Sequence, residues 1–152
     1  MKGLKLKIAV AADHGGYELR IVIINFLTKE GYEVVDLGNV EYDAQDDYTD
    51  FAQKLALAVS SGQAERGVVI CGSGVGACVT ANKIKGIRAS VCHDTYSAHQ
   101  GVEHDNMNVL CLGARIIGSE LAKELADAFL KAKFINEGKY KRRLDKLNKL
   151  DE

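Results

Sequence analysis

The stretch Gly67-Val-Val-Ile-Cys71, followed directly by Gly72-Ser-Gly-Val-Gly76, decides the fold of this chain. A short apolar run that ends in a glycine-rich turn and leads into a helical pattern is typical of a buried strand in a parallel α/β sheet. The glycines let a ligand approach the backbone closely, and the free N–H groups of the next helix point toward the same place. The turn therefore predicts a phosphate or oxyanion site, although a plain strand-to-helix turn would have the same pattern.

Apolar runs and helical patterns alternate on both sides of this stretch. Strands are expected at residues 7–12, 33–37, 67–71, 88–92 and 108–112. Helices are expected at 17–30, 51–60, 77–84, 119–133 and 139–150, and another helix begins over 95–100. Strands that alternate with helices form βαβ units with right-handed crossovers. The sequence therefore predicts a single Rossmann-like α/β domain over residues 1–152, with three layers and a five-stranded parallel sheet.

The composition excludes several classes of protein. The chain has 152 residues, 47% of them hydrophobic, and a formal net charge of −1, so no global field attracts nucleic acid or a membrane surface. No apolar run approaches the ~18 residues of a membrane span, and residues 1–8 alternate charged and apolar side chains, unlike a signal peptide. None of the four cysteines forms a C-x-x-C pair. We expect a cytoplasmic protein with reduced thiols and no nucleic-acid or membrane partner.

The glycine turn also fits a dinucleotide-binding site. Gly72-x-Gly74-x-x-Ala77 matches the G-x-G-x-x-A fingerprint, and Asp94 lies at a strand end about 20 residues further on, where a ribose-binding acid is expected. Only one predicted strand follows Asp94, which leaves little sheet for the second half of a dinucleotide. The pattern thus leaves a nucleotide-binding module open as an alternative.

Polar residues gather where the predicted strands end, and ligands of parallel sheets bind at that edge. Cys71 is the last residue of its strand, and a helix N-terminus favours the thiolate form of a nearby cysteine. Such a thiol can act as a nucleophile or base, whereas most cysteines at strand ends are small core residues. We interpret Cys78, Cys92 and Cys111 as core residues of this kind.

Two histidines are candidates for chemistry. His14 lies in Asp13-His-Gly-Gly16 at the end of the first strand, where it can bind a phosphate or a sugar hydroxyl, or lie in a surface turn. His104 lies in a polar stretch before the fifth strand, where a general acid/base role competes with a solvated loop histidine.

The C-terminal segment 139–150 is basic on one side and apolar on the other. It carries six basic residues and one acidic residue, and Tyr140, Leu144 and Leu147 form an apolar stripe at spacings of four and three. The segment is either a solvated amphipathic helix or a clamp for phosphate. Nucleic-acid binding is disfavoured, because the rest of the chain is nearly neutral and only 7% of residues are aromatic.

Taken together, the motifs resemble one known family. They occur in the order D-H-G-G (13–16), C-G-S-G-V-G (71–76), A-N-K-I-K-G-I-R-A (81–89), E-H-D-N-M-N-V-L-C-L-G-A-R (103–115) and E-G-K-Y-K-R-R (137–143). This order is similar to that of the type B ribose-5-phosphate isomerase family, which includes galactose-6-phosphate and allose-6-phosphate isomerases. The resemblance covers about residues 7 to 147.

The resemblance implies an aldose–ketose isomerase of carbohydrate metabolism, in the pentose phosphate pathway, that interconverts ribose 5-phosphate and ribulose 5-phosphate. The reaction runs through a cis-enediolate without metal or cofactor. The implied site roles are Cys71 as the base between C1 and C2, Ser73 for proton transfer between O1 and O2, Gly72, Gly74 and Gly76 as a backbone anion hole, His104 with Asp13 in ring opening, Tyr48 and Asp105 beside the sugar, and His14, Arg115, Lys139 and Arg143 on the phosphate.

The resemblance also implies a shared site between two copies of the chain. The family forms homodimers, sometimes assembled into tetramers, and the matches of Lys139 and Arg143 come from the partner subunit, so the C-terminal helix is expected to pack on that partner. The sequence departs from the family at four positions, where Asp105 replaces Asn, Lys139 replaces Arg, Tyr140 replaces His and Thr49 replaces Pro. The exact sugar therefore stays open, with a six-carbon aldose phosphate as the nearest alternative and a non-catalytic nucleotide or phosphosugar module as the next.

Overall fold

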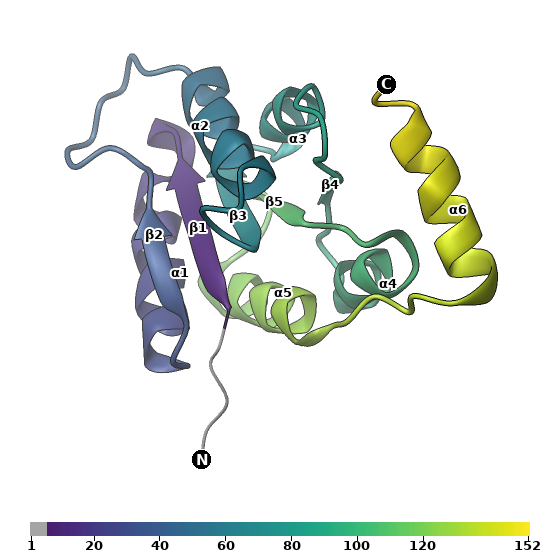
Figure 1. Ribbon diagram of the computed structural model, residues 1–152. Coiled ribbons are helices and arrows are strands. Elements are labelled where there is room, and N and C mark those ends of the chain that lie inside the picture. Colours follow the sequence, from purple (N-terminus) through teal and green to yellow (C-terminus); the bar gives the residue numbers. More distant parts are fainter. Residues whose placement is uncertain (1–5) are drawn as a thin grey trace.

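The computed structural model describes residues 6–152, and these residues form one sheet with helices on both faces (Figure 1). The strands are β1 (Lys7–Ala12), β2 (Glu33–Asp36), β3 (Arg66–Cys71), β4 (Ala89–Val91) and β5 (Val109–Gly113). The helices are α1 (Tyr17–Lys29), α2 (Tyr48–Ser60), α3 (Val75–Ala81), α4 (Thr95–Asp105), α5 (Ser119–Lys131) and α6 (Gly138–Lys149), with a short 3₁₀ turn, η1 (His14–Gly16), after β1.

The five strands are all parallel and lie in the order β2-β1-β3-β5-β4. The central strands are buried on both faces, which explains why they are continuous apolar runs in the sequence. From β1 the chain first adds β2 on one side and then crosses back to add β3 on the other side of β1. The strand order therefore reverses between the neighbouring strands β1 and β3. Ligands of open α/β sheets bind at the carboxyl end of such a reversal. The prediction of a five-stranded parallel sheet is confirmed.

Two hydrophobic cores give the molecule its three layers. One core packs α1, α4 and α5 against one face of the sheet, with Ile23, Val102 and Phe129 fully buried. The other packs α2 and α3 against the opposite face, with Leu55 and Ala77 fully buried. The three-layer α/β prediction is therefore confirmed.

Helix α6 lies outside these layers. It stands apart from the sheet beside α4 and contributes no buried residue (Figure 1). Its apolar stripe is only partly covered within one chain, because Tyr140 and Leu144 are half-buried and Leu147 is 42% exposed. No helix within residues 6–152 is long and apolar enough to span a membrane.

The expectation of a polar loop around His104 is wrong. Helix α4 continues through Asp105 and ends at Asn106, which adopts a left-handed conformation with φ 53°. The second half of the helix is held because Ala98 and Val102, four residues apart, are fully buried on one face.

Candidate active site

A cavity of about 330 Å³ lies at the carboxyl edge of the sheet, where the strand order reverses between β1 and β3. It collects seven of the residues that the sequence assigned to the site, together with one apolar residue. Its lining consists of Asp13, Tyr48, Cys71, Gly72, Ser73, Gly76, Arg115 and Ile116.

The Cys71 thiol is held at the start of the glycine turn. Its side chain is 4% exposed, and its Sγ accepts a hydrogen bond from the backbone N–H of Gly74 at 3.1 Å. Gly74 has φ 85°, which favours glycine, and a Cβ there would lie 3.1 Å from the carbonyl carbon of Leu112. A donor aimed at sulfur stabilises its charged form. The turn therefore supplies a preorganised hydrogen bond to the Cys71 sulfur.

The loops that follow β1, β3 and β5 contact one another closely. A Cβ on Gly15 would lie 3.2 Å from the backbone nitrogen of Gly72, and a Cβ on Gly113 would lie 2.6 Å from the carbonyl oxygen of Ser73. The Ser73 hydroxyl accepts a hydrogen bond from the backbone N–H of Val75. These contacts fix the glycine turn between its two neighbouring strands.

Tyr48, the first residue of α2, lies directly over the glycine turn. A Cβ added to Gly76 would come within 2.7 Å of the Tyr48 ring, so the ring packs against the Gly76 backbone. Tyr48 as a whole is still 42% exposed and lines the cavity, where it is available to a substrate.

The Asp13 carboxyl group is buried beside the cavity, with 8% of the residue exposed. Its Oδ1 accepts the backbone N–H of Gly15 at 2.9 Å. Burial raises the pKa of Asp13, while the neighbouring His14 opposes that shift. A carboxyl group with a raised pKa is better able to hold and release a proton near neutral pH.

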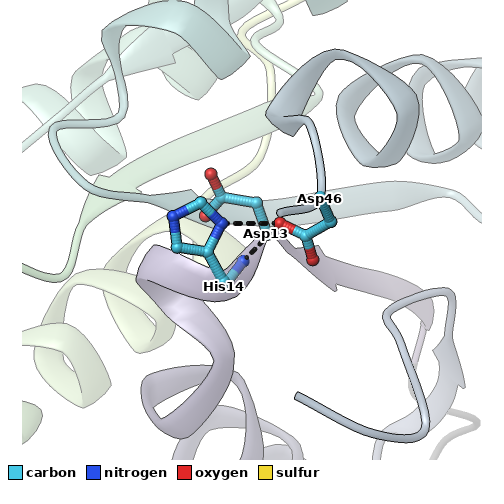
Figure 2. A group of neighbouring side chains, drawn as sticks. All are labelled: Asp13, His14 and Asp46. Carbon is cyan, nitrogen blue, oxygen red and sulfur yellow. Dashed lines mark hydrogen bonds and ion pairs between the residues drawn. The ribbon is translucent and has the colours of Figure 1, made fainter. Parts of the chain in front are cut away.

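His14 is paired with Asp46, a residue that the sequence analysis missed (Figure 2). The Oδ1 of Asp46 lies 2.7 Å from the imidazole Nδ1 and accepts the backbone N–H of His14 at 2.9 Å. The hydrogen bond to Asp46 raises the pKa of His14 although partial desolvation opposes it. Asp46 is 32 residues from His14, in an acidic loop without a recognisable motif, so no sequence signal marked it.

The same group is the candidate for a metal site among residues 6–152. Asp13, His14 and Asp46 place three potential ligand atoms within 4.8 Å of one another. However, the Nδ1 of His14 is hydrogen-bonded to the Asp46 carboxylate, and a carboxylate can only accept such a bond. Nδ1 therefore carries a proton, which favours a hydrogen-bonded pair over metal coordination by that nitrogen.

Arg115 follows β5 and lies at the rim of the cavity. Its backbone N–H donates to the carbonyl of Gly72 at 3.0 Å, and a Cβ on Gly72 would lie 3.6 Å from the Arg115 Cδ. Its charge also acts on His14, whose pKa it lowers. Arg115 and His14 are thus two positively polarised groups on the same edge of the site.

Four predicted site residues lie elsewhere in the chain. Helix α4 returns from the carboxyl edge toward the amino edge of the sheet, so His104 and Asp105 lie at the end away from Cys71. Lys139 and Arg143 lie on α6, and none of these four residues lines the cavity at Cys71. One chain therefore does not bring the complete predicted site together.

His104 instead contacts α6 of its own chain. Its imidazole stacks on the Tyr140 ring with centroids 4.6 Å apart, and its Nδ1 lies 2.7 Å from the amide nitrogen of Gln100. The ammonium of Lys139 lies 5.3 Å from the centroid of the same Tyr140 ring. Asp105 lines a separate cavity of about 560 Å³ along β4 and the end of α6.

The strand order disfavours the dinucleotide site. Asp94 follows β4, which is separated from the glycine-turn strand β3 by β5. A dinucleotide-binding acid instead ends the strand next to the glycine turn. The Asp94 carboxylate caps α4 by accepting the backbone N–H of Ser97 at 2.7 Å, which gives this residue a structural role.

The remaining cysteines differ from one another. Cys92 and Cys111 are buried, as the sequence predicted. Cys78 is only half-buried, and a hydrogen bond with Cys111 lowers the pKa of its thiol to about 7. Because Cys111 is fully buried, Cys78 is the member of the pair that ionises first. Cys78 thus packs against the second core at its edge, half-buried, with a thiol that ionises more readily than those of the two buried cysteines.

Comparison with known proteins gives the family of the chain. A family model described as Ribose/Galactose Isomerase matches residues 8–147. The ribose-5-phosphate isomerase B of Escherichia coli is 40% identical over 96% of this chain and 97% of its own length. The D-erythrulose-4-phosphate isomerase of Pectobacterium atrosepticum is 43% identical over 85% of each chain.

A solved structure has the same fold over almost its whole length. It is ribose-5-phosphate isomerase B from Mycoplasma genitalium with bound ribulose 5-phosphate, and it superposes with a TM-score of 0.89, 40% identity and 95% coverage of both chains. The named relatives and this structure thus place the chain among the sugar-phosphate isomerases. The chain belongs to the ribose/galactose isomerase family, and the prediction of an enzyme of this class is confirmed.

Proposed function

We propose that the protein interconverts ribose 5-phosphate and ribulose 5-phosphate. The observation that carries the proposal is the Cys71 thiol, placed in a cavity at the strand reversal with the Gly74 N–H at 3.1 Å. The names of the relatives in Escherichia coli and Mycoplasma genitalium support this substrate. The reaction belongs to the pentose phosphate pathway, and we assign the protein to the cytoplasm.

The chemistry is a proton transfer between neighbouring carbons. The Cys71 thiolate removes the proton from C2 of the open-chain aldose, and the electron pair moves to the C1–C2 bond while O1 becomes an oxyanion. The backbone N–H groups of the turn at Gly72, Gly74 and Gly76 stabilise that charge. Ser73 moves the proton between O2 and O1, and Cys71 returns its proton to C1. Atoms and charge balance without metal or cofactor.

Ring opening and phosphate binding need groups on both sides of the cavity. Asp13, whose pKa is raised by burial, acts with His104 on the ring oxygen and the anomeric hydroxyl. His14 and Arg115 bind the phosphate from the edge of the same chain, and Lys139 and Arg143 bind it from a second chain.

A second copy of this chain is assigned as the source of the missing groups. His104, Asp105, Lys139 and Arg143 do not line the cavity at Cys71 in one chain. Exposed apolar residues lie at that cavity and on the helix that follows the glycine turn: Ile116 lines the cavity and is 62% exposed, and Val75 and Val79 on α3 are each 57% exposed. A homodimer in which α6 packs on the partner would cover this surface and complete both sites, and tetramers would be pairs of such dimers.

The second candidate is another phosphosugar. The 43% identity to a D-erythrulose-4-phosphate isomerase favours testing a four-carbon substrate, and the family description extends to galactose phosphate. Asp105, Lys139, Tyr140 and Thr49, which depart from the family pattern, are the residues expected to tune this choice.

The test is a coupled assay over tetrose, pentose and hexose phosphates. Ribose 5-phosphate is expected to have the highest kcat/KM, and the Cys71→Ala variant serves as the matched inactive control. A higher kcat/KM for a hexose or tetrose phosphate would replace the pentose assignment. Thermal stabilisation by NAD and not by any phosphosugar would instead favour the nucleotide-binding alternative.

A further inference from the structure

A chain of hydrogen bonds begins at a buried arginine and ends at His14. Arg20 on α1 is 4% exposed, and its two terminal nitrogens donate to the Asp36 carboxylate and to the carbonyl of Asn39. A Cβ on Gly38 would lie 2.6 Å from the Arg20 side chain, so glycine at this position lets the loop pass over the guanidinium. The segment between β2 and α2 is therefore attached to α1 by a buried charge.

Asp46 lies at the other end of that segment. Its Oδ2 accepts a hydrogen bond from the side-chain amide of Asn39 at 3.0 Å. Its Oδ1 accepts hydrogen bonds from the backbone N–H and from the ring Nδ1 of His14. Only 8% of the Asp46 side chain is exposed, compared with 31% for His14. Figure 2 shows the two contacts of Asp46 Oδ1 with His14. Since Asn39 binds Oδ2, both carboxylate oxygens have partners, which fixes the carboxylate plane relative to the imidazole.

The pairing decides which atom His14 can offer to a ligand. Because a carboxylate only accepts hydrogen bonds, Nδ1 must carry a proton. A neutral ring with its proton on Nδ1 presents a lone pair on Nε2, which repels a phosphate oxygen. Only the imidazolium form presents an Nε2–H donor and a positive charge.

The surroundings favour that form of His14. The hydrogen bond to Asp46 is the main cause that raises its pKa, and the charge of Asp13 adds to it, while desolvation and Arg115 oppose it. The Tyr42 ring packs edge-on against the imidazole, and Glu18 lines the same groove as His14. Asp46 is thus the contact that most favours a charged His14.

We infer that Asp46 is a positioning residue for the phosphate end of the site. Asp46 orients the imidazole through Nδ1 and favours the protonated form of His14, so that the Nε2–H of His14 faces the substrate phosphate. Asn39 and Arg20 hold Asp46 in place. The inference rests on the phosphate role that the proposed function gives to His14, and it assigns a task to a residue outside the recognised motifs.

The test compares Asp46→Asn with Asp43→Asn in the full-length protein. The first substitution keeps the shape of the side chain but removes its charge. Asp43 is an exposed acid of the same loop whose Oδ1 accepts the Gln45 N–H, a contact that asparagine preserves. The readouts are the His14 pKa by NMR titration of its ring carbons, competitive inhibition by inorganic phosphate, and KM and kcat for ribose 5-phosphate between pH 6 and 9.

Asp46→Asn is expected to lower the His14 pKa by about one unit or more. It should raise KM and the phosphate inhibition constant by about tenfold near pH 8, with a smaller effect near pH 6 and a kcat that changes less. Asp43→Asn should leave all three quantities unchanged. A KM effect that grows with pH is a signature that a merely structural role of Asp46 would not produce.

The two levels of the proposal fail differently. An unchanged His14 pKa in Asp46→Asn would overturn the inference about Asp46. A lowered pKa with unchanged phosphate inhibition and KM would retain control of the His14 proton by Asp46 and overturn the phosphate role of His14. Equal effects of Asp46→Asn and Asp43→Asn would mean that His14 responds to the total negative charge of the loop and not to its contact with Asp46. That result would also overturn the inference.

Discussion

The imidazole of His104 stacks on the Tyr140 ring, with centroids 4.6 Å apart and planes 30° from parallel. The stack joins the end of α4 to the start of α6, and it lies at the opposite edge of the sheet from Cys71. His104 and the basic face of α6 thus form one unit within a chain. If a partner supplies one of them to a neighbouring site, it supplies both.

This relationship predicts complementation between inactive chains. Cys71→Ala and His104→Ala should each be inactive, whereas their mixed dimer contains one site with both native residues, because each site takes Cys71 from one chain and His104 from the other. At equal mixing, about a quarter of the sites should be intact. The measurement is kcat after co-refolding or subunit exchange.

The same experiment with Arg143→Ala in place of His104→Ala should give the same recovery. Dimer formation is checked by differently tagged chains. Mixed dimers that form and remain inactive would show that Cys71 and His104 must come from the same chain, which would contradict the shared site.

The second prediction concerns the base. Cys71→Ala should lower kcat by ~10²-fold or more, because a base acts mainly in the transition state. Binding of ribose 5-phosphate, measured by calorimetry, should be nearly unchanged, since the phosphate contacts do not involve sulfur. Cys78→Ala, which removes a thiol that does not line the cavity, is the matched control. A Cys71→Ala variant with most of its kcat would exclude this residue as the base.

The third prediction concerns the contact between Gly76 and Tyr48. Gly76→Ala would place a methyl group within 2.7 Å of the Tyr48 ring, and the ring must move because the backbone of the turn is fixed. We expect KM to rise about tenfold. Gly118→Ala adds the same methyl group in open space and is the control.

A double-mutant cycle shows whether the effect passes through the ring. Gly76→Ala should add little to Tyr48→Ala, because the displaced group is then already absent. Fully additive effects would mean that the methyl group acts on the glycine turn itself. Thermal unfolding of each variant shows whether the fold has been retained.

Much of the fold follows from the sequence because burial on both faces leaves a continuous apolar run. The runs ending at Ala12 and Cys71 were sufficient to place Asp13 and the glycine turn at one edge, since parallel strands share their carboxyl ends. The extent of α4 was underestimated, because its second half is polar except for Val102, and only the packed core shows how well that residue is buried.

The role of Asp46 could not be predicted from the sequence. Its contact with His14 crosses 32 residues and depends on how Arg20 and Asn39 hold an irregular loop. No periodicity describes such a loop, and the neighbouring Asp43 and Asp47 look equivalent to Asp46 in the sequence. The resemblance assigned Lys139 and Arg143 to a partner subunit, but nothing in the sequence indicated that His104 and Asp105 lie away from the cavity at Cys71, because motif order along the chain does not show at which edge of the sheet a helix ends.

The last prediction concerns Cys78, whose thiol has a pKa lowered to about 7 by its hydrogen bond with Cys111. The thiolate is the reactive form, so alkylation by iodoacetamide should rise with pH and be half-maximal near that pKa. Peptide mass spectrometry should find label on Cys78, while Cys92, whose pKa is raised by burial, stays unmodified in the native protein. Cys111→Ala removes the donor and should shift the Cys78 curve to higher pH, whereas Cys111→Ser keeps a donor at the same position and should shift it less. Identical curves in the native protein and both variants would show that Cys111 does not control the Cys78 thiol.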